Sequence, residues 1–178
     1  MTPCTGQVRR ASAADAPGIG VVHVAAWRSA YPGVLPDQFL AKLSASRQAV
    51  FYDRAIRLGA GVHVATADED RIIGFSTARR TRNSRLAEGE VETLYVLDDF
   101  KECGFGRRLL RASAQHLSTL GCGSVLAWVL QDNPARFFYE HLGGKRIATS
   151  TTRVGGSDIP QTAFVWNPID RLLGDTRI

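Results

Sequence analysis

The stretch from Glu90 to Leu110 constrains the fold more than any other part of the chain, because it predicts a strand, a glycine loop and the start of a helix in succession. Residues 93–96, Thr-Leu-Tyr-Val, favour a pleated strand. Gly104 and Gly106 leave the nearby backbone N–H groups uncovered. A helix that begins near Phe105 also has unpaired N–H donors and a partial positive charge in its first turn. This arrangement suits a phosphate or pyrophosphate group.

The glycine pair does not belong to either of the two familiar nucleotide motifs. A dinucleotide fingerprint requires a third glycine at the position of Leu109, and a phosphate P-loop requires Gly-Lys-Ser/Thr, which is absent from this loop. Taken alone, Gly-x-Gly is also typical of an ordinary turn between a strand and a helix. The nearby Arg107, Arg108 and Arg111 add positive charge to the predicted helix.

The loop resembles the acetyl-CoA loop of the GNAT superfamily of N-acetyltransferases, whose pattern is Arg or Gln, two residues, Gly, one residue, and Gly or Ala. Here Lys101 stands at the first position, and Asp98 stands where relatives often have proline. The resemblance implies acetyl-CoA as cosubstrate, and an α+β, mixed fold whose central, mostly antiparallel twisted sheet of about six to seven strands is flanked by about four helices. It implies cosubstrate contacts by Leu94, Val96, Lys101, Glu102, Cys103, Gly104, Phe105, Gly106, Arg107, Asn133 and Tyr139.

A second motif, residues 133–144 with the sequence NPARFFYEHLGG, lies one predicted strand beyond that helix. By itself it predicts a helix that Asn133 caps, with Pro134 in its first turn. It resembles the GNAT segment with an asparagine, a small residue, a Phe-Tyr pair and a glycine pair. The resemblance implies that Asn133 holds the pantetheine arm and that Tyr139 is a catalytic residue. A tyrosine of pKa ~10 can donate a proton to the departing thiolate, whose thiol has a pKa of ~8.5, without being ionised beforehand.

Two carboxylates lie on the predicted strand before the glycine loop. Strand alternation places Glu90 and Glu92 on the same face as Leu94 and Val96, an unusual position for two charges unless that face lines a wet cleft. An amine of pKa ~10.4 is mostly protonated at neutral pH, so its acetylation benefits from a proton acceptor. The resemblance gives this catalytic role to Glu90, with Glu92 as the second candidate. The alternative is a strand end in solvent.

Residues 27–36, WRSAYPGVLP, predict the end of a helix and an aromatic pair, Trp27 and Tyr31. Core packing is the simpler interpretation of this pair. The resemblance implies instead that the segment walls the acceptor pocket, which makes Tyr31 a candidate substrate contact. Trp27, Glu92 and Asp158 are further candidates, because the aromatic pair could face a cation and the carboxylates would make the cleft locally acidic. The acidic side chains favour a primary amine acceptor, such as a small polyamine, an amino-acid-like compound, a peptide N-terminus or a lysine, with an antibiotic amine as the alternative.

The remaining pattern predicts one domain spanning residues 1–178, with its core at about 8–166. Apolar periodicity and turn residues indicate strands at 8–10, 62–67, 72–78, 124–130, 146–154 and 162–166, and helices at 12–30, 36–58 (possibly broken), 105–120 and 134–142. The last two strands should form a hairpin around a turn at residues 155–160.

A net charge of +5 leaves three interpretations of the basic run from Arg79 to Arg85: a solvated loop first, attraction of a polyanionic cosubstrate second, and nucleic-acid binding third. Two alternative functions therefore remain open, a basic nucleic-acid-binding module and a GNAT-fold protein that senses acetyl-CoA without transferring it. Cys4, Cys103 and Cys122 show no zinc or disulfide spacing, so we expect free thiols and no metal. The N-terminus lacks the apolar core of a signal peptide, so we expect a cytoplasmic protein without membrane contact. We also expect a monomer or a homodimer.

Overall fold

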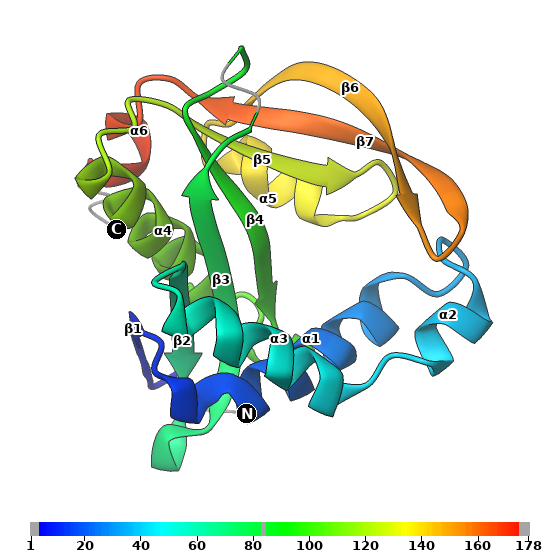
Figure 1. Cartoon of the computed structure of the whole chain (residues 1–178). Coiled ribbons are helices and arrows are strands. Elements are labelled where there is room, and N and C mark those ends of the chain that lie inside the picture. Colours follow the sequence, from blue (N-terminus) through cyan, green and yellow to red (C-terminus); the bar gives the residue numbers. More distant parts are fainter. Residues whose placement is uncertain (1–3, 83–84, 175–178) are drawn as a thin grey trace.

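The computed structural model describes residues 4–82 and 85–174, and its centre is a seven-stranded sheet in the order β1-β2-β3-β4-β5-β7-β6 (Figure 1). Every neighbouring pair is antiparallel except β4 and β5, which run parallel. The α+β class and the strand number therefore agree with the sequence prediction. The strands are β1 (Gln7–Arg10), β2 (Gly61–Thr66), β3 (Ile72–Arg80), β4 (Gly89–Val96), β5 (Val125–Leu130), β6 (Lys145–Val154) and β7 (Ser157–Trp166).

Helices cover both faces of this sheet. On one face, α1 and α3 pack on β2 and β3 through a core that includes Ile19, Tyr52 and Phe75. On the other face, α4 and α5 share a core with β5 and β7 that includes Leu110 and Trp166. The helices are α1 (Ala16–Ala30), α2 (Asp37–Ala41), α3 (Ala45–Arg57), α4 (Phe105–Thr119), α5 (Ala135–His141) and α6 (Asp170–Leu173). Within the part of the chain that the structure describes, no helix is both long and apolar enough to cross a membrane.

The sheet opens between its two parallel strands. β4 and β5 pair only where Gly89–Val91 meets Val125–Ala127. Beyond these residues the strands separate, and Figure 1 shows β5 and the β6–β7 hairpin turning away from β3 and β4. The second half of β4 therefore lacks a strand neighbour on its β5 side among the described residues.

A β-bulge in β4 changes which side chains share a face. Thr93 pairs with Thr77 but Val91 pairs with Ala78, so Glu92 is the extra residue. Val91 and Leu94 consequently both pack on the α4 side of the sheet. The prediction that the glutamates share a face with Leu94 and Val96 is wrong, because simple alternation holds only in a strand without a bulge.

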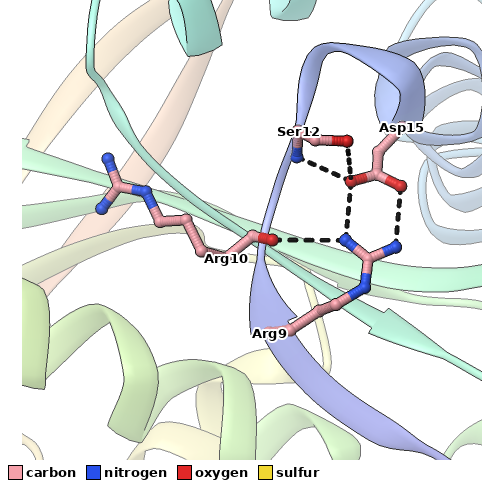
Figure 2. Close-up of polar contacts among 4 residues, drawn as sticks. All are labelled: Arg9, Arg10, Ser12 and Asp15. Carbon is pink, nitrogen blue, oxygen red and sulfur yellow. Dashed lines mark hydrogen bonds and ion pairs between the residues drawn. The ribbon is translucent and has the colours of Figure 1, made fainter.

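A half-buried ion pair fixes the entry to the first helix (Figure 2). The guanidinium of Arg9 donates to both carboxylate oxygens of Asp15, at 2.8 and 2.9 Å. The backbone N–H of Ser12 donates to the same carboxylate at 2.7 Å, which is one half of a capping box. These bonds join β1 to the 3₁₀ turn Ala13–Asp15 that precedes α1. Hydrogen bonds from Arg9 hold the pKa of Asp15 below its ordinary value, although burial opposes them.

The prediction of free thiols is wrong for two of the three cysteines. Cys4 and Cys103 form a disulfide with a Cα–Cα distance of 5.3 Å, and Cys122 is a buried free thiol. The bond joins the N-terminal segment to the residue before Gly104, across a sequence separation of 99. Such a pairing depends on the fold bringing distant segments together, which spacing along the sequence does not reveal.

Other element boundaries differ in detail. Arg79 and Arg80 belong to β3, so the predicted basic loop is shorter, and its residues 83–84 lie outside the described residues. The last hairpin turns tightly at Gly155 and Gly156, both with positive φ, so β7 already begins at Ser157 rather than at Thr162. The predicted broken helix consists of α2 and α3.

We expect Asp15→Asn to lower the free energy of unfolding by about 2 kcal/mol near neutral pH, because the charge that holds Arg9 and Ser12 is lost. A depressed folded pKa stabilises the protein fully above the ordinary aspartate pKa, and this contribution disappears as the pH falls through the folded value. Urea denaturation should therefore show the wild-type and variant curves converging at acid pH.

The exposed pair between Asp53 and Arg57, one helical turn apart, provides the control for this measurement. Asp53→Asn should change the unfolding free energy little, because solvent screens an exposed pair. Equal losses in the Asp15 and Asp53 variants would contradict the importance of the half-buried pair between Arg9 and Asp15.

We also expect reduction of Cys4–Cys103 to lower the free energy of unfolding, by at most about 4–5 kcal/mol for a loop of this length. Thiol titration of the denatured protein should find one reactive thiol before reduction and three afterwards. Cys4→Ser should reproduce the destabilisation, while Cys122→Ala should remain sensitive to the reductant. Three thiols in the unreduced protein would rule out the bond.

Candidate active site

Two cavities meet in the gap between β4 and β5. The first, which we call the donor cavity, has a volume of about 510 Å³ and lies between α1, β4, the glycine loop and α5. The second, the acceptor cavity, has a volume of about 390 Å³ and is bounded by α1, β4, β5 and the β6–β7 hairpin. Both cavities are lined by Leu94, Tyr95, Asn133 and Ala135. A molecule bound in one cavity can thus touch a molecule bound in the other.

The N-terminus of α4 opens toward the donor cavity. Gly104 adopts a left-handed conformation with φ of 79°, and its carbonyl accepts the first helical hydrogen bond, from Arg108 N–H. The N–H groups of residues 105–107 are therefore unpaired within the helix. A Cβ atom at Gly106 would lie 3.2 Å from the Phe138 ring, so glycine there allows α5 to pack closely against the loop.

The free edge of β4 supplies further backbone donors. Leu97 N–H donates to Ile73 of β3, and antiparallel bonding alternates along a strand. Leu94 and Val96, at the alternate positions, therefore direct their backbone N–H and C=O groups toward the gap. These unpaired groups can form strand-like hydrogen bonds with an extended ligand.

The remaining predicted cosubstrate contacts divide between lining and buried positions. Lys101 and Glu102 line the donor cavity, and Lys101 pairs with Asp98, which also accepts from the Ser29 hydroxyl. Arg107 is exposed on the first turn of α4. The Phe105 ring is buried in the core, so only its backbone can serve the site. Cys103 is held in the disulfide.

The acceptor cavity brings together most of the predicted catalytic and substrate residues, namely Trp27, Tyr31, Glu90, Glu92 and Tyr139. Asp158 is not among its lining residues. It lies at the start of β7 with its side chain 67% exposed and pairs with Arg153 at 3.4 Å.

The two glutamates share one cation. Arg79 lies directly across from Glu90 on β3, and its guanidinium is 2.5 Å from Glu92 Oε1 and 3.7 Å from Glu90 Oε2. Burial raises the pKa of Glu90; Arg79 opposes this shift, the Glu92 carboxylate adds to it, and Arg82 opposes it. The Glu90 side chain is 17% exposed against 37% for Glu92, so Glu90 is the more buried of the two carboxylates.

Side-chain hydrogen bonds join α1 to the start of α5 where the cavities meet. Asn133 Oδ1 accepts from Ala135 N–H at 2.9 Å, and Asn133 Nδ2 donates to the Tyr31 hydroxyl, also at 2.9 Å. Tyr139 lines the acceptor cavity, but its ring packs in the core against Phe164 and Trp166. Burial raises the pKa of Tyr139 well above its ordinary value.

Sequence reasoning missed several lining residues. Trp128 and Gln161 belong to β5 and β7, and Ser29 belongs to α1. The predicted basic loop begins at Arg79, but this residue belongs to β3, and the β-prone residues directly before it were a signal that the strand could continue. Trp128 offered a weaker signal, a bulky residue in an otherwise aliphatic buried run.

Comparison with known proteins agrees with this geometry. Residues 25–144 match the model of the acetyltransferase (GNAT) family. The uncharacterized N-acetyltransferase YuaI of Bacillus subtilis (strain 168) is 28% identical over 167 residues, which are 93% of this chain and 95% of that protein.

Two solved structures share the fold. One is yncA, a putative acetyltransferase from Salmonella typhimurium with its cofactor acetyl-CoA, with a TM-score of 0.68 and 19% identity over 98% of this chain and 97% of that one. The other is a GCN5-related N-acetyltransferase from Rhodopseudomonas palustris, with a TM-score of 0.73 and 16% identity over 94% of this chain and 98% of that one. With the family match extending over more than half of its length, this chain belongs to the GNAT family and is an acetyl-CoA-dependent acyltransferase.

Proposed function

We propose that this enzyme transfers the acetyl group of acetyl-CoA directly to a primary amine of a small molecule or peptide. The observation that carries the proposal is the meeting of two cavities at the β4–β5 gap, with a bare helix N-terminus in the first and two carboxylates in the second. Direct transfer requires both substrates at one point, and the shared lining residues provide such a point. Cys103 has no nucleophilic role here, because its sulfur is bonded to Cys4.

The donor cavity fits an extended, phosphate-containing thioester such as acetyl-CoA. The unpaired N–H groups at residues 105–107 and the exposed Arg107 favour the pyrophosphate. The free backbone groups of Leu94 and Val96 would hold the pantetheine arm in the manner of an added strand, and an N–H at this edge would polarise the thioester carbonyl. Acetyl-CoA supplies the activated acetyl group, so the protein needs no covalent intermediate.

The acceptor cavity favours a cationic amine. Two carboxylates face one guanidinium, which leaves the group of Glu90, Glu92 and Arg79 with a net negative charge. A protonated amine would enter this field and lose its surplus proton to Glu90, either directly or through water. The rings of Trp27 and Trp128 provide apolar surface for the rest of the acceptor. Glu92 is the second candidate for the base, and Tyr139 is the thiol proton donor that the family resemblance indicates.

We expect Gly104→Asp to abolish the rise in melting temperature that acetyl-CoA produces, because a carboxylate would face the helix N–H groups that bind phosphate. Gly104→Ala is the matched control. Both variants carry the cost of a side chain at positive φ, about 1–2 kcal/mol, but only aspartate adds a negative charge. The alanine variant should keep a clear shift.

Equal shifts in melting temperature for these two variants would contradict the assignment of phosphate binding to this loop. Gly106→Asp is the poorer test, because a side chain there would also collide with Phe138.

We expect amines to exceed alcohols and anionic amines in a screen that measures thiol release from acetyl-CoA. On the best amine, Glu90→Gln should lower kcat/KM by about 10²-fold and remove the acid limb of its pH profile. Arg79→Gln should move that limb to higher pH, because loss of the cation raises the pKa of Glu90. The active carboxylate then forms only at a higher pH.

Glu92→Gln is the control for the choice of base. If it abolishes the limb while Glu90→Gln is silent, the base is Glu92. If alcohols or anionic amines are the best acceptors, the primary-amine proposal fails.

A further inference from the structure

The β6–β7 hairpin gives the acceptor cavity a wall that is polar but uncharged. Thr152 of β6 and Gln161 of β7 line the cavity there. In the sheet order β4-β5-β7-β6, this wall lies beyond β5 from the two glutamates of β4. Neighbouring strands are ~4.8 Å apart, so β4 and β7 are separated by about 10 Å, and by more where β4 and β5 diverge. The cavity therefore has a carboxylate end and, at some distance from it, an amide end.

A hydrogen bond across the hairpin orients the Gln161 amide. Ser150 and Gln161 are directly paired on β6 and β7, so their side chains lie on the same face. Gln161 Nε2 donates to Ser150 Oγ at 2.9 Å. None of the described residues donates a hydrogen bond to Gln161 Oε1. This oxygen is free to accept a hydrogen bond from a molecule bound in the cavity that Gln161 lines.

The hairpin brings no cation to this wall. Arg153 lies between Thr152 and Val154, so strand alternation directs its side chain to the opposite face, where it pairs with Asp158 directly across the hairpin. Among the described residues that line the acceptor cavity, none is a lysine, an arginine or a histidine. The guanidinium of Arg79 already pairs with the two glutamates. A carboxylate carried by the acetyl acceptor would therefore meet like charge and find no free cation.

We propose that the acetyl acceptor is a diamine and that Gln161 selects it by accepting a hydrogen bond from its second ammonium group; this rests on the proposed transfer to an amine. One amine group reaches the glutamates and is acetylated there. The second stays protonated and donates to Gln161 Oε1, and such a charge-assisted bond is stronger than one from a neutral hydroxyl. The apolar chain between the two nitrogens lies along Trp128, which lines the cavity from β5. Gln161 is thus a specificity-determining residue for the acceptor.

Three six-carbon amines that differ only at the far end test this inference: 1,6-diaminohexane, hexylamine and 6-aminohexanoate. Thiol release from acetyl-CoA should give the diamine a kcat/KM about tenfold above that of hexylamine, after correction for its two equivalent amines, because one hydrogen bond from a charged group contributes about this factor. The compound with a carboxylate should be the poorest of the three. The four-carbon series, run alongside, covers a shorter separation of the two ends, and the better length decides.

Two opposite charge changes at Gln161 sharpen the test. Gln161→Glu should widen the advantage of the diamine over hexylamine to about 10²-fold, because the second ammonium then meets a carboxylate. Gln161→Lys should reverse the ranking, so that 6-aminohexanoate exceeds the diamine. A loss of folding cannot move the ranking in two opposite directions.

Ser150→Ala is the second variant, and it should reduce the preference for the diamine, because the hydroxyl that orients Gln161 is lost. Arg153→Gln, on the opposite face of the hairpin, is the matched control and should keep the preference.

The inference is overturned if the wild-type enzyme acetylates hexylamine as well as the diamine, if it favours 6-aminohexanoate, or if the two Gln161 variants leave the ranking unchanged. Acetylation of amines in general would survive each of these results. Absence of thiol release with every amine would instead overturn the proposed function, and this inference with it.

Discussion

The separation of β4 from β5 is the constraint on which the site depends. Parallel strands that pair over three residues and then diverge leave backbone groups of Leu94 and Val96 without strand partners. Such groups are costly to bury unpaired, so the gap calls for a ligand or water that can replace the missing strand. The bulge at Glu92 adds the second condition. It turns the glutamates toward the acceptor cavity while Leu94 packs against α4, so one strand serves a charged cleft and an apolar core together.

Local chemistry made the cosubstrate half of the site predictable. The start of α4 at Phe105, the left-handed Gly104 and the hydrogen bond from Ala135 N–H to Asn133 all follow from residues within a few positions of one another, although Pro134, not Asn133 as predicted, is the N-cap of α5. The acceptor half was less predictable, because its geometry depends on pairing between strands. Nothing local to β4 reveals that Val91 pairs with Ala78 while Thr93 pairs with Thr77. The disulfide shows the same limit, since it is formed only after the fold brings the N-terminal segment beside the glycine loop.

The net charge of the whole chain does not predict the charge of the acceptor cavity. The chain carries +5, yet the acceptor cavity contains two carboxylates, and Arg79 from the basic run partly neutralises them. Without this cation, burial and the repulsion of Glu92 would both raise the pKa of Glu90, and a protonated Glu90 could not accept a proton. A cation in closer contact with Glu90 would lower its pKa further, and the Glu90 carboxylate would then be a weaker base. Arg79 lies 3.7 Å from Glu90 but 2.5 Å from Glu92. The closer contact is therefore with Glu92, and the effect of Arg79 on the pKa of Glu90 is weaker than a direct ion pair would give.

The hydrogen bond between Tyr31 and Asn133 connects residues 102 positions apart. It therefore joins the aromatic segment 27–36 to the motif at residues 133–144. The aromatic segment after α1 walls the acceptor cavity, whereas Asn133 begins the segment that packs Phe138 over Gly106 at the donor cavity. One amide therefore holds the Tyr31 hydroxyl in the acceptor cavity and accepts from the backbone at the start of α5, beside the donor cavity. Because Asn133 has a single oxygen and that oxygen is committed to Ala135, the amide can offer Tyr31 only an N–H. The phenol oxygen therefore accepts this hydrogen bond, which ties the wall of the acceptor cavity to the segment that begins α5.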